Sequence, residues 1–158
     1  NVARVLRIGD RQSGEHDLVQ ERPGLNAAVV EGARHAQERW PDAAVAALVG
    51  DLPALTPSEL AQALDAAAGH GRAFVADSTG TGTTMLTATP GAELEPAFGP
   101  GSAERHASRA VLLPAGPGLR RDVDTESDLH AAVLLGVGPS TLAAIEARSP
   151  VVHPDRAS

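Results

Sequence analysis

The chain contains a run of seven consecutive apolar residues, positions 43–49, which is followed after one glycine by Asp51. An apolar run without alternation predicts a strand that is buried on both faces, as in a parallel sheet covered by helices on either side. In open sheets of this kind, ligands bind just beyond the carboxyl ends of the strands. Asp51 is therefore expected to lie where a ligand would bind, or it is a solvated acid that ends the strand or caps the next turn.

Helices are predicted on both sides of this strand. Apolar positions recur at helical spacing over residues 25–40, and Pro41 ends the pattern. Thr56, Pro57 and Glu59 form a capping box with proline at the first helical position, which predicts a helix to about residue 68. Thr125 and Asp128 predict the start of another helix in the same way.

The remaining elements complete an alternation of strands and helices. Strands are expected at residues 2–8, 72–76, 84–88 and 110–113, and further helices at residues 101–109 and 140–148. This alternation predicts an α/β protein, one layered sheet with helices on both faces. A single domain is expected over residues 1–150, with a loose tail over residues 151–158. Because the chain opens with Asn1 and enters a predicted strand almost at once, we expect a further N-terminal part.

Composition restricts the classes of partner. A hydrophobic content of 42% in 158 residues is enough for a core. A net charge of -7, with two Phe, one Trp and no Tyr, works against binding of polymeric nucleic acid. No cysteine is present for disulfides or thiolate metal sites, and no apolar run approaches the roughly 20 residues that span a bilayer. These features predict a cytoplasmic protein with no membrane partner.

A pair of acids, Asp122 and Asp124, occurs in the segment LRRDVDT. In an extended segment, side chains two residues apart point to one side of the sheet, and like charges held so close repel each other unless a cation neutralises them. Arg120 and Arg121 could supply that charge. Alternatively, Asp51 joins the pair, and three hard oxygen ligands converge as Mg²⁺ prefers beside phosphates.

Two glycine-rich segments suggest binding of anions. In ADSTGTGTTML, peptide N–H groups with Thr81 and Thr83 could cradle a phosphate, or the segment is a flexible hairpin turn. In FGPGSAERH, Gly99 and Gly101 permit tight turns, and Ser102 stands at a helix N-terminus that favours an anion, or is a plain N-cap.

Three further side chains allow two interpretations each. Arg105 and His106 either add positive charge to the anion site or lie on a solvated helix face. Asn26 either binds a phosphate or nucleotide edge, or simply suits the first turn of a helix. No two histidines have zinc-ligand spacing, and no Gly-x-Ser-x-Gly segment occurs, so neither zinc nor serine nucleophile chemistry is expected.

Five segments in order, PGLNAAV, GDLPALT, ADSTGTGTTML, FGPGSAERH and GLRRDVDTESDL, resemble the guanylyltransferases that activate phosphoenolpyruvate or 2-phospho-L-lactate in deazaflavin coenzyme biosynthesis. The resemblance covers residues 24–148. It implies a Rossmann-like nucleotidyltransferase fold, three-layered with a mixed, mainly parallel sheet. It also implies magnesium-dependent transfer from GTP to a phosphorylated three-carbon acid, with release of pyrophosphate. Phosphoenolpyruvate is the preferred acceptor because GDLPAL and FGPGS are closest to that branch.

The resemblance also implies roles for single residues. Asp51 and an acid of RDVDT would hold Mg²⁺ and serve catalysis, with Asp122 favoured and Asp124 left to prepare the helix cap. The acid substrate would contact Thr83 and its neighbour Gly82, together with Gly99 and Ser102. The nucleotide side would include Gly24 and Asn26.

One departure from the family leaves other functions open. The family's N-terminal strand and basic loop, which grip the triphosphate, have no counterpart here, so this chain alone is expected to bind the acid better than GTP. The alternatives are 2-phospho-L-lactate guanylyltransferase, or a nucleotidyltransferase with another acceptor such as a sugar phosphate or a molybdopterin. From a different class, the chain could be a non-catalytic small-molecule-binding domain of the same fold.

Overall fold

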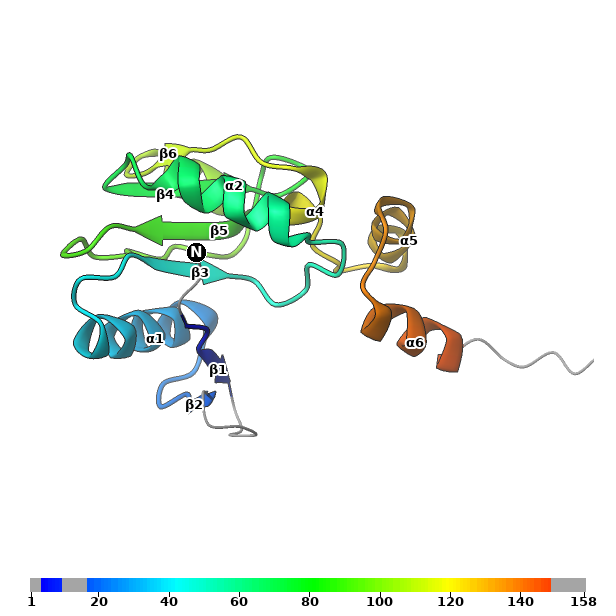
Figure 1. Cartoon of the computed structure of the whole chain (residues 1–158), viewed down its shortest axis with the longest axis horizontal. Helices are drawn as coiled ribbons and strands as arrows, with labels where there is room; N and C mark the ends of the chain where they lie inside the picture. The colour runs from blue at the N-terminus through cyan, green and yellow to red at the C-terminus, as the bar shows by residue number, and fades with distance from the viewer. Residues whose placement is uncertain (1–3, 10–16, 149–158) are drawn as a thin grey trace, which may run out of the picture.

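The computed structural model describes residues 4–9 and 17–148 of the chain (Figure 1). The first described element is a small parallel pair, β1 (Arg7–Gly9) with β2 (Asp17–Val19). The sequence predicted a strand at residues 2–8 but not β2. The predicted tail over residues 151–158 lies outside the described residues.

The main sheet has four strands in the order β3–β5–β4–β6: β3 (Val45–Leu48), β5 (Thr83–Ala88), β4 (Arg72–Ala76) and β6 (Val111–Leu112). Strand β5 runs antiparallel to both of its neighbours, whereas β4 and β6 are parallel. The mixed sheet is confirmed, but the expected predominance of parallel pairs does not hold in it. The reason is the turn at residues 77–82, which is too short for the crossover that a parallel pair requires.

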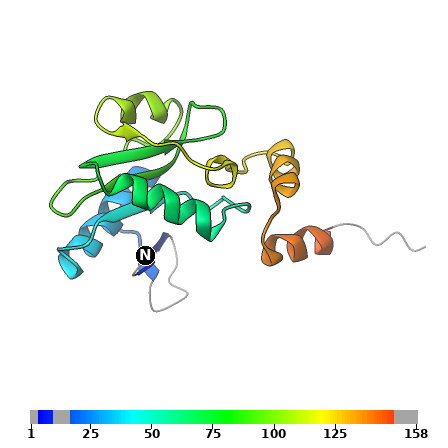
Figure 2. The ribbon, with the colours of Figure 1, turned by 45° about the horizontal axis from the view of Figure 1, so that its top comes forward.

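Helices cover both faces of this sheet, which confirms the α/β class with three layers (Figures 1 and 2). On one face, α1 (Leu25–Arg39) and α3 (Ser102–Ala107) enclose a core built around Phe74 and Leu86. On the other face, α2 (Pro57–Ala67) and α4 (Pro117–Arg120) enclose a core built around Val75 and Met85. All six residues of β5 are buried between the two cores.

Both predicted capping boxes are present. The Thr56 hydroxyl accepts a hydrogen bond from the Glu59 N–H at 3.2 Å, and the Glu59 carboxylate accepts one from the Thr56 N–H at 3.1 Å. The same reciprocal pair joins Thr125 and Asp128 at the start of α5 (Glu126–Leu135). These starts were predictable because the contacts span only three residues.

Strand β3 is not buried on both faces, contrary to the prediction for residues 43–49. Val45 and Ala47 pack against the core beneath α1, but Ala46 and Leu48 on the opposite face are exposed, Leu48 to 37%. Among the described strands, β3 pairs with β5 alone, so it forms an edge of the sheet. An alanine-rich run is apolar on both faces whether or not both faces are covered, which explains why the pattern was misleading.

The last two helices, α5 and α6 (Pro139–Arg148), project away from the sheet (Figure 1). Both helices are described over their whole length. Within α5 only Ala132 is buried, and within α6 no residue is buried. Leu134 on α5 is 80% exposed. None of the helices in the described part of the chain is both long enough and apolar enough to cross a membrane.

Candidate active site

The predicted site residues gather at one end of the main sheet. There the end of β3 is hydrogen-bonded to the start of β5, from the Val49 N–H to the Thr84 carbonyl at 3.1 Å. The end of β4 lies beside the same start, because Ala76 pairs with Thr83. Asp51 follows β3 after a short link, as the sequence analysis predicted for a ligand-binding position.

Asp122 and Asp124 do not lie on an extended segment of the sheet, contrary to prediction. They lie in the loop between α4 and α5, because the short helix α4, which the sequence analysis missed, redirects the chain. The Val123 N–H in this loop donates a hydrogen bond of 3.2 Å to the Asp51 carbonyl. This contact between backbones brings the two predicted acidic segments together.

Glu59 holds α4, and with it the acidic loop, in place. Its carboxylate accepts the Gly118 N–H at 2.8 Å in addition to completing the capping box. Burial alone would raise the pKa of Glu59, but the hydrogen bonds from Gly118 and Thr56 outweigh it and lower the pKa. The capping residue found in the sequence therefore also fixes a distant helix.

We call Asp51, Asp77, Asp122 and Asp124 the acidic cluster. The pKa of Asp122 is raised, first by burial and then by the negative charges of the other three members. Burial by itself carries no information about charge, but the contribution of the three carboxylates corresponds to a negative potential at Asp122, which favours a cation. The expected crowding of negative charge is therefore present, and it includes Asp77, which the sequence analysis did not single out.

Within the described part of the chain, the neighbouring arginines form no ion pair with the acidic cluster. Arg120 donates hydrogen bonds to the backbone carbonyls of Ala76 and Asp77, the shortest at 2.7 Å. Arg121 lies 3.7 Å from the carboxylate of Asp128 at the start of α5. Among the ion pairs between described residues, none involves a member of the acidic cluster.

The acidic cluster fits Mg²⁺ held by few protein ligands. Within residues 4–9 and 17–148, no three histidine, aspartate or glutamate side chains come close enough to hold a metal ion together, so the expected convergence of three ligands is not found. Mg²⁺ commonly binds one or two carboxylates and takes its other ligands from water and substrate phosphates. Asp51 and Asp122 offer hard, unneutralised oxygens of this kind, and magnesium stays a prediction.

The glycine-rich turn binds an anionic group, but that group is the carboxylate of Asp77 in the same turn. The carboxylate of Asp77 accepts the N–H groups of Thr81 and Gly82, each at 2.9 Å, and the Thr79 hydroxyl at 3.0 Å. A Cβ atom at Gly82 would lie 2.5 Å from Asp77 Oδ2, so only glycine fits there. These two N–H groups are therefore not available to cradle a phosphate, and a substrate contact by Gly82 stays a prediction.

Two predicted substrate residues, Thr83 and Ser102, come together beside this turn. The Ser102 hydroxyl donates a hydrogen bond of 3.2 Å to Thr83 Oγ1. Thr83 is 7% exposed and Ser102 only 1%. Thr83 is therefore the more exposed member of the pair.

His106 lies directly behind Thr83, and neither interpretation from the sequence holds for it. It is 3% exposed and packs against the rings of Phe74 and Phe98, with centroid distances of 5.9 and 5.3 Å. Burial, and to a lesser extent the charge of Arg105, lowers the pKa of His106. Burial and the direction of the pKa shift disfavour a charged imidazole, and the ring does not lie on a solvated helix face.

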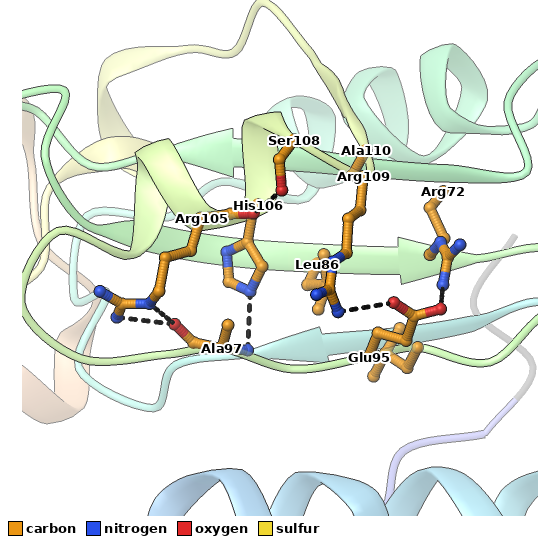
Figure 3. Close-up of a pocket in the computed structure, with 10 residues that line it drawn as sticks. Arg72, Leu86, Glu95, Ala97, Arg105, His106, Ser108, Arg109 and Ala110 are labelled. Carbon is orange, nitrogen blue, oxygen red and sulfur yellow. Dashed lines mark hydrogen bonds and ion pairs between the residues drawn. The ribbon is translucent and has the colours of Figure 1, made fainter.

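The FGPG loop is held by side chains that the sequence analysis had considered for ligand binding. Arg105 donates to the carbonyls of residues 97, 99 and 100, the shortest bond being 2.6 Å to Pro100 (Figure 3 shows the bonds to Ala97). Asn26 Oδ1 accepts the Phe98 N–H at 2.7 Å, and its amide donates to the Phe98 carbonyl at 3.1 Å. Asn26 retains one amide hydrogen for the predicted nucleotide contact.

The start of α3 offers fewer free N–H groups than predicted. The Ser102 N–H is bonded to the Gly99 carbonyl and the Ala103 N–H to the Thr81 carbonyl. Gly99 and Gly101 have φ values of 116° and 71°, a conformation that favours glycine, as their predicted role in tight turns requires. A contact of Gly99 with the acid, and of Gly24 with the nucleotide, stays a prediction.

A cavity of about 160 Å³ lies beside the C-terminal end of α3, lined by Leu86, Leu94, Glu95 and Arg109 among others (Figure 3). Glu95 crosses it, paired with Arg72 and with Arg109. Arg105 and His106 also line it, whereas none of the residues that the resemblance assigns to a substrate or to metal does.

Comparison with known proteins gives a consistent picture. The chain is 54% identical over 140 residues to the phosphoenolpyruvate guanylyltransferase of Frankia casuarinae, covering 84% of this chain and 48% of that protein. It is 51% identical over 165 aligned positions to that of Thermomonospora curvata, covering 97% and 72% respectively. The corresponding Streptomyces scabiei protein is 54% identical over 124 residues, covering 77% and 57%. The chain thus spans about half to three quarters of the length of these relatives, and no protein-family model matches it.

Proposed function

The chain belongs to the phosphoenolpyruvate guanylyltransferase family, and from that premise we propose that the whole protein transfers the guanylyl group of GTP to phosphoenolpyruvate. The products are enolpyruvoyl-diphospho-guanosine and pyrophosphate. We place the reaction in the cytoplasm, in the biosynthesis of the deazaflavin coenzyme. No observation favours a second function, because the relatives named above share this one description.

The observation that carries the proposal is the hydrogen bond from the Val123 N–H to the Asp51 carbonyl. It joins the segments of Asp51 and Asp122 beyond the end of β3, and that end is itself hydrogen-bonded to Thr84, the residue after Thr83. A site for a cation and a hydroxyl donor for a phosphorylated acid thus lie along one end of the sheet. Nucleotidyl transfer between two polyanions requires both.

The reaction depends more on how the protein positions the two substrates than on covalent chemistry by its own side chains. An oxygen of the phosphoenolpyruvate phosphate forms a bond to the α-phosphorus of GTP, and the bond from that phosphorus to the bridging oxygen breaks, so that pyrophosphate leaves. The attacking phosphate is already ionised at neutral pH, so no general base is required. Thr83 would hold the acid, supported from behind by Ser102.

Asp51 and Asp122 would hold Mg²⁺, which when bound supplies positive charge to the phosphate oxygens on which negative charge develops. Asp122 is half-buried, which strengthens its electrostatic interactions, whereas Asp51 is exposed to water. Asp77 contributes indirectly, because its carboxylate is committed to the turn that positions Thr83.

The proposal is tested by incubating the full-length protein with Mg²⁺, GTP and phosphoenolpyruvate and by following pyrophosphate release. Parallel reactions use 2-phospho-L-lactate as the acceptor and CTP or ATP as the donor. We expect release to be fastest with GTP and phosphoenolpyruvate. Release with none of these pairs would point to the non-catalytic alternative.

The role of Asp51 is tested by Asp51→Asn, with Asp65→Asn on the exposed face of α2 as the matched control. The variant should fold like the wild type, because the contact to Val123 uses only the backbone of Asp51. Its magnesium-dependent turnover should fall by a factor of about 100 or more, since a carboxylate ligand of the metal is lost. Turnover close to that of the control would show that Asp51 is not a ligand.

A further inference from the structure

The position of the proton on His106 can be derived from its partners. The backbone N–H of Ala97 donates a hydrogen bond of 2.9 Å to Nε2, so Nε2 must carry a lone pair (Figure 3). In a neutral imidazole the proton then resides on Nδ1. A charged imidazolium would place a second N–H against the N–H of Ala97, so it would require that contact to break.

This tautomer determines what Thr83 can do. Nδ1 lies 2.8 Å from Thr83 Oγ1, and with the proton on Nδ1 the threonine oxygen must accept. The Ser102 hydroxyl donates to the same oxygen at 3.2 Å. Both lone pairs of Thr83 are thereby used, and among the described residues none accepts a hydrogen bond from its hydroxyl.

We propose that His106 is a positioning residue that makes Thr83 an obligatory hydrogen-bond donor to the phosphorylated acid. The inference rests on the proposed function for the assumption that this acid binds at Thr83. Its oxygens are acceptors only, so a hydroxyl whose proton is not used by the described residues binds them without first breaking another hydrogen bond. A water molecule or a sugar hydroxyl can itself donate a hydrogen bond, so it gains less from a threonine that can only donate. The arrangement therefore favours binding of an anionic oxygen.

The tautomer is measurable without any turnover. Long-range ¹H–¹⁵N correlation spectra of the protein labelled in histidine should show a protonated Nδ1 and an unprotonated Nε2 for His106. Histidines at exposed positions, such as His130, serve as internal references. A protonated Nε2, or an imidazolium near the ordinary histidine pKa, would overturn the proposal.

Two isosteric substitutions separate the contacts of the ring. In His106→Asn, the amide nitrogen occupies the place of Nδ1 and can still donate to Thr83. In His106→Gln, the amide oxygen reaches the place of Nε2 and can accept the Ala97 N–H, but no donor faces Thr83. A purely structural role would make the glutamine variant the milder of the two.

Affinity for phosphoenolpyruvate is measured by calorimetry on the full-length protein with Mg²⁺ present. His106→Gln should raise its Kd by about tenfold or more, and His106→Asn by about threefold or less, because only the former loses the directed hydrogen bond. The Kd for GTP should change little in both variants. Equal losses in the two variants, or a matching loss for GTP, would contradict the proposal.

A double-mutant cycle with Thr83→Val shows whether His106 acts through Thr83. In the valine background, His106→Gln should cause no further loss of affinity for phosphoenolpyruvate. If the two losses simply add, His106 does not act through Thr83 and the proposal fails while the proposed function stands. If Thr83→Val alone leaves the affinity unchanged, Thr83 does not contact the acid, and both this inference and the assigned acid site fail.

Discussion

The position of Asp122 in the acidic cluster lowers the stability of the folded protein at neutral pH. Because burial and the neighbouring carboxylates raise its pKa, ionisation is harder in the folded than in the unfolded chain. Any stability linked to this group is therefore fully present below the ordinary aspartate pKa and is lost as the pH rises through the raised one. We expect Asp122→Asn to raise Tm at neutral pH in buffer without divalent metal.

The same measurement over a range of pH checks the cause. The gain in Tm should shrink as the pH falls toward the ordinary aspartate pKa, because Asp122 is then protonated in both states. Asp65→Asn, on the exposed face of α2, serves as the control for replacing a carboxylate by an amide. A gain that is constant with pH would mean that packing, and not charge, is responsible.

At the scale of residues, the sequence predicted what depends on near neighbours. Thr56 with Glu59, and Thr125 with Asp128, are contacts over three residues, and both were predicted correctly. The partners of His106 were not predictable, because Thr83 and Ala97 approach it only once the sheet has formed. A histidine on a six-residue helix carries no signal of burial by itself.

At the scale of elements, the turn between β4 and β5 depends on one carboxylate. Asp77→Ala would leave the N–H groups of Thr81 and Gly82 without their acceptor, at a cost of about 2 to 4 kcal/mol in unfolding free energy. Added phosphate should restore part of the Tm, because an external anion can replace the carboxylate. Thermal unfolding with increasing phosphate measures both effects.

The matched variant for this test is Thr79→Ala. It removes one hydroxyl contact with the Asp77 carboxylate but leaves the carboxylate in place. We expect a smaller loss of Tm and no response to phosphate beyond that of the wild type. An equal response in both variants would show that phosphate binds elsewhere.

The packing of α4 on α2 depends on Gly118, which has no side chain to collide with the neighbouring residues. A Cβ atom at Gly118 would lie 2.2 Å from the Ala54 carbonyl oxygen and 2.5 Å from Glu59 Oε2. Gly118→Ala should therefore cost about 3 kcal/mol in unfolding free energy, as overpacking does, and should displace the acidic loop that follows α4. Chemical denaturation measures the loss.

Gly69→Ala is the control for this prediction, since nothing lies within 4 Å of the added carbon. Its unfolding free energy should stay close to that of the wild type. A tolerated Gly118→Ala would show that α4 can move away from α2 without penalty.

The elements themselves were largely predictable, whereas their pairing was not. Helix α1 and strand β4 follow from periodicity, and their observed bounds agree with the prediction to within a residue. The edge position of β3 depends on which strand inserts beside it, and no local pattern carries that information. The acidic loop was misplaced for a similar reason, because helix α4 is too short to show a period.

At the scale of the whole molecule, stability should decrease from the sheet toward the projecting helices. Strand β5 is buried over its whole length, whereas α6 has no buried residue along its described length. We expect amide hydrogen exchange to be slowest in β4 and β5 and to be fast throughout α6. Mass spectrometry of peptic fragments measures this order, and protection of α6 equal to that of β5 would show that this helix is covered in solution.

The order of the five motifs along the chain predicted the family, which the identities of about half of the residues confirm. Each motif alone was ambiguous, because a glycine-rich turn or an acid after a strand occurs in many folds. Their joint order is much more restrictive. The roles of the single residues within the motifs needed the structure, as Asp77 and Arg105 show.

The bond between the Val123 N–H and the Asp51 carbonyl is made entirely by main-chain atoms. Any amino acid except proline at position 123 can form it, and no exchange of an aspartate at 51 or 122 removes it. The side chains at positions 51 and 122, which we propose to hold metal, can thus be exchanged one at a time while this backbone contact between their segments is preserved. The backbone arrangement of the site therefore does not depend on which side chains stand at these two positions.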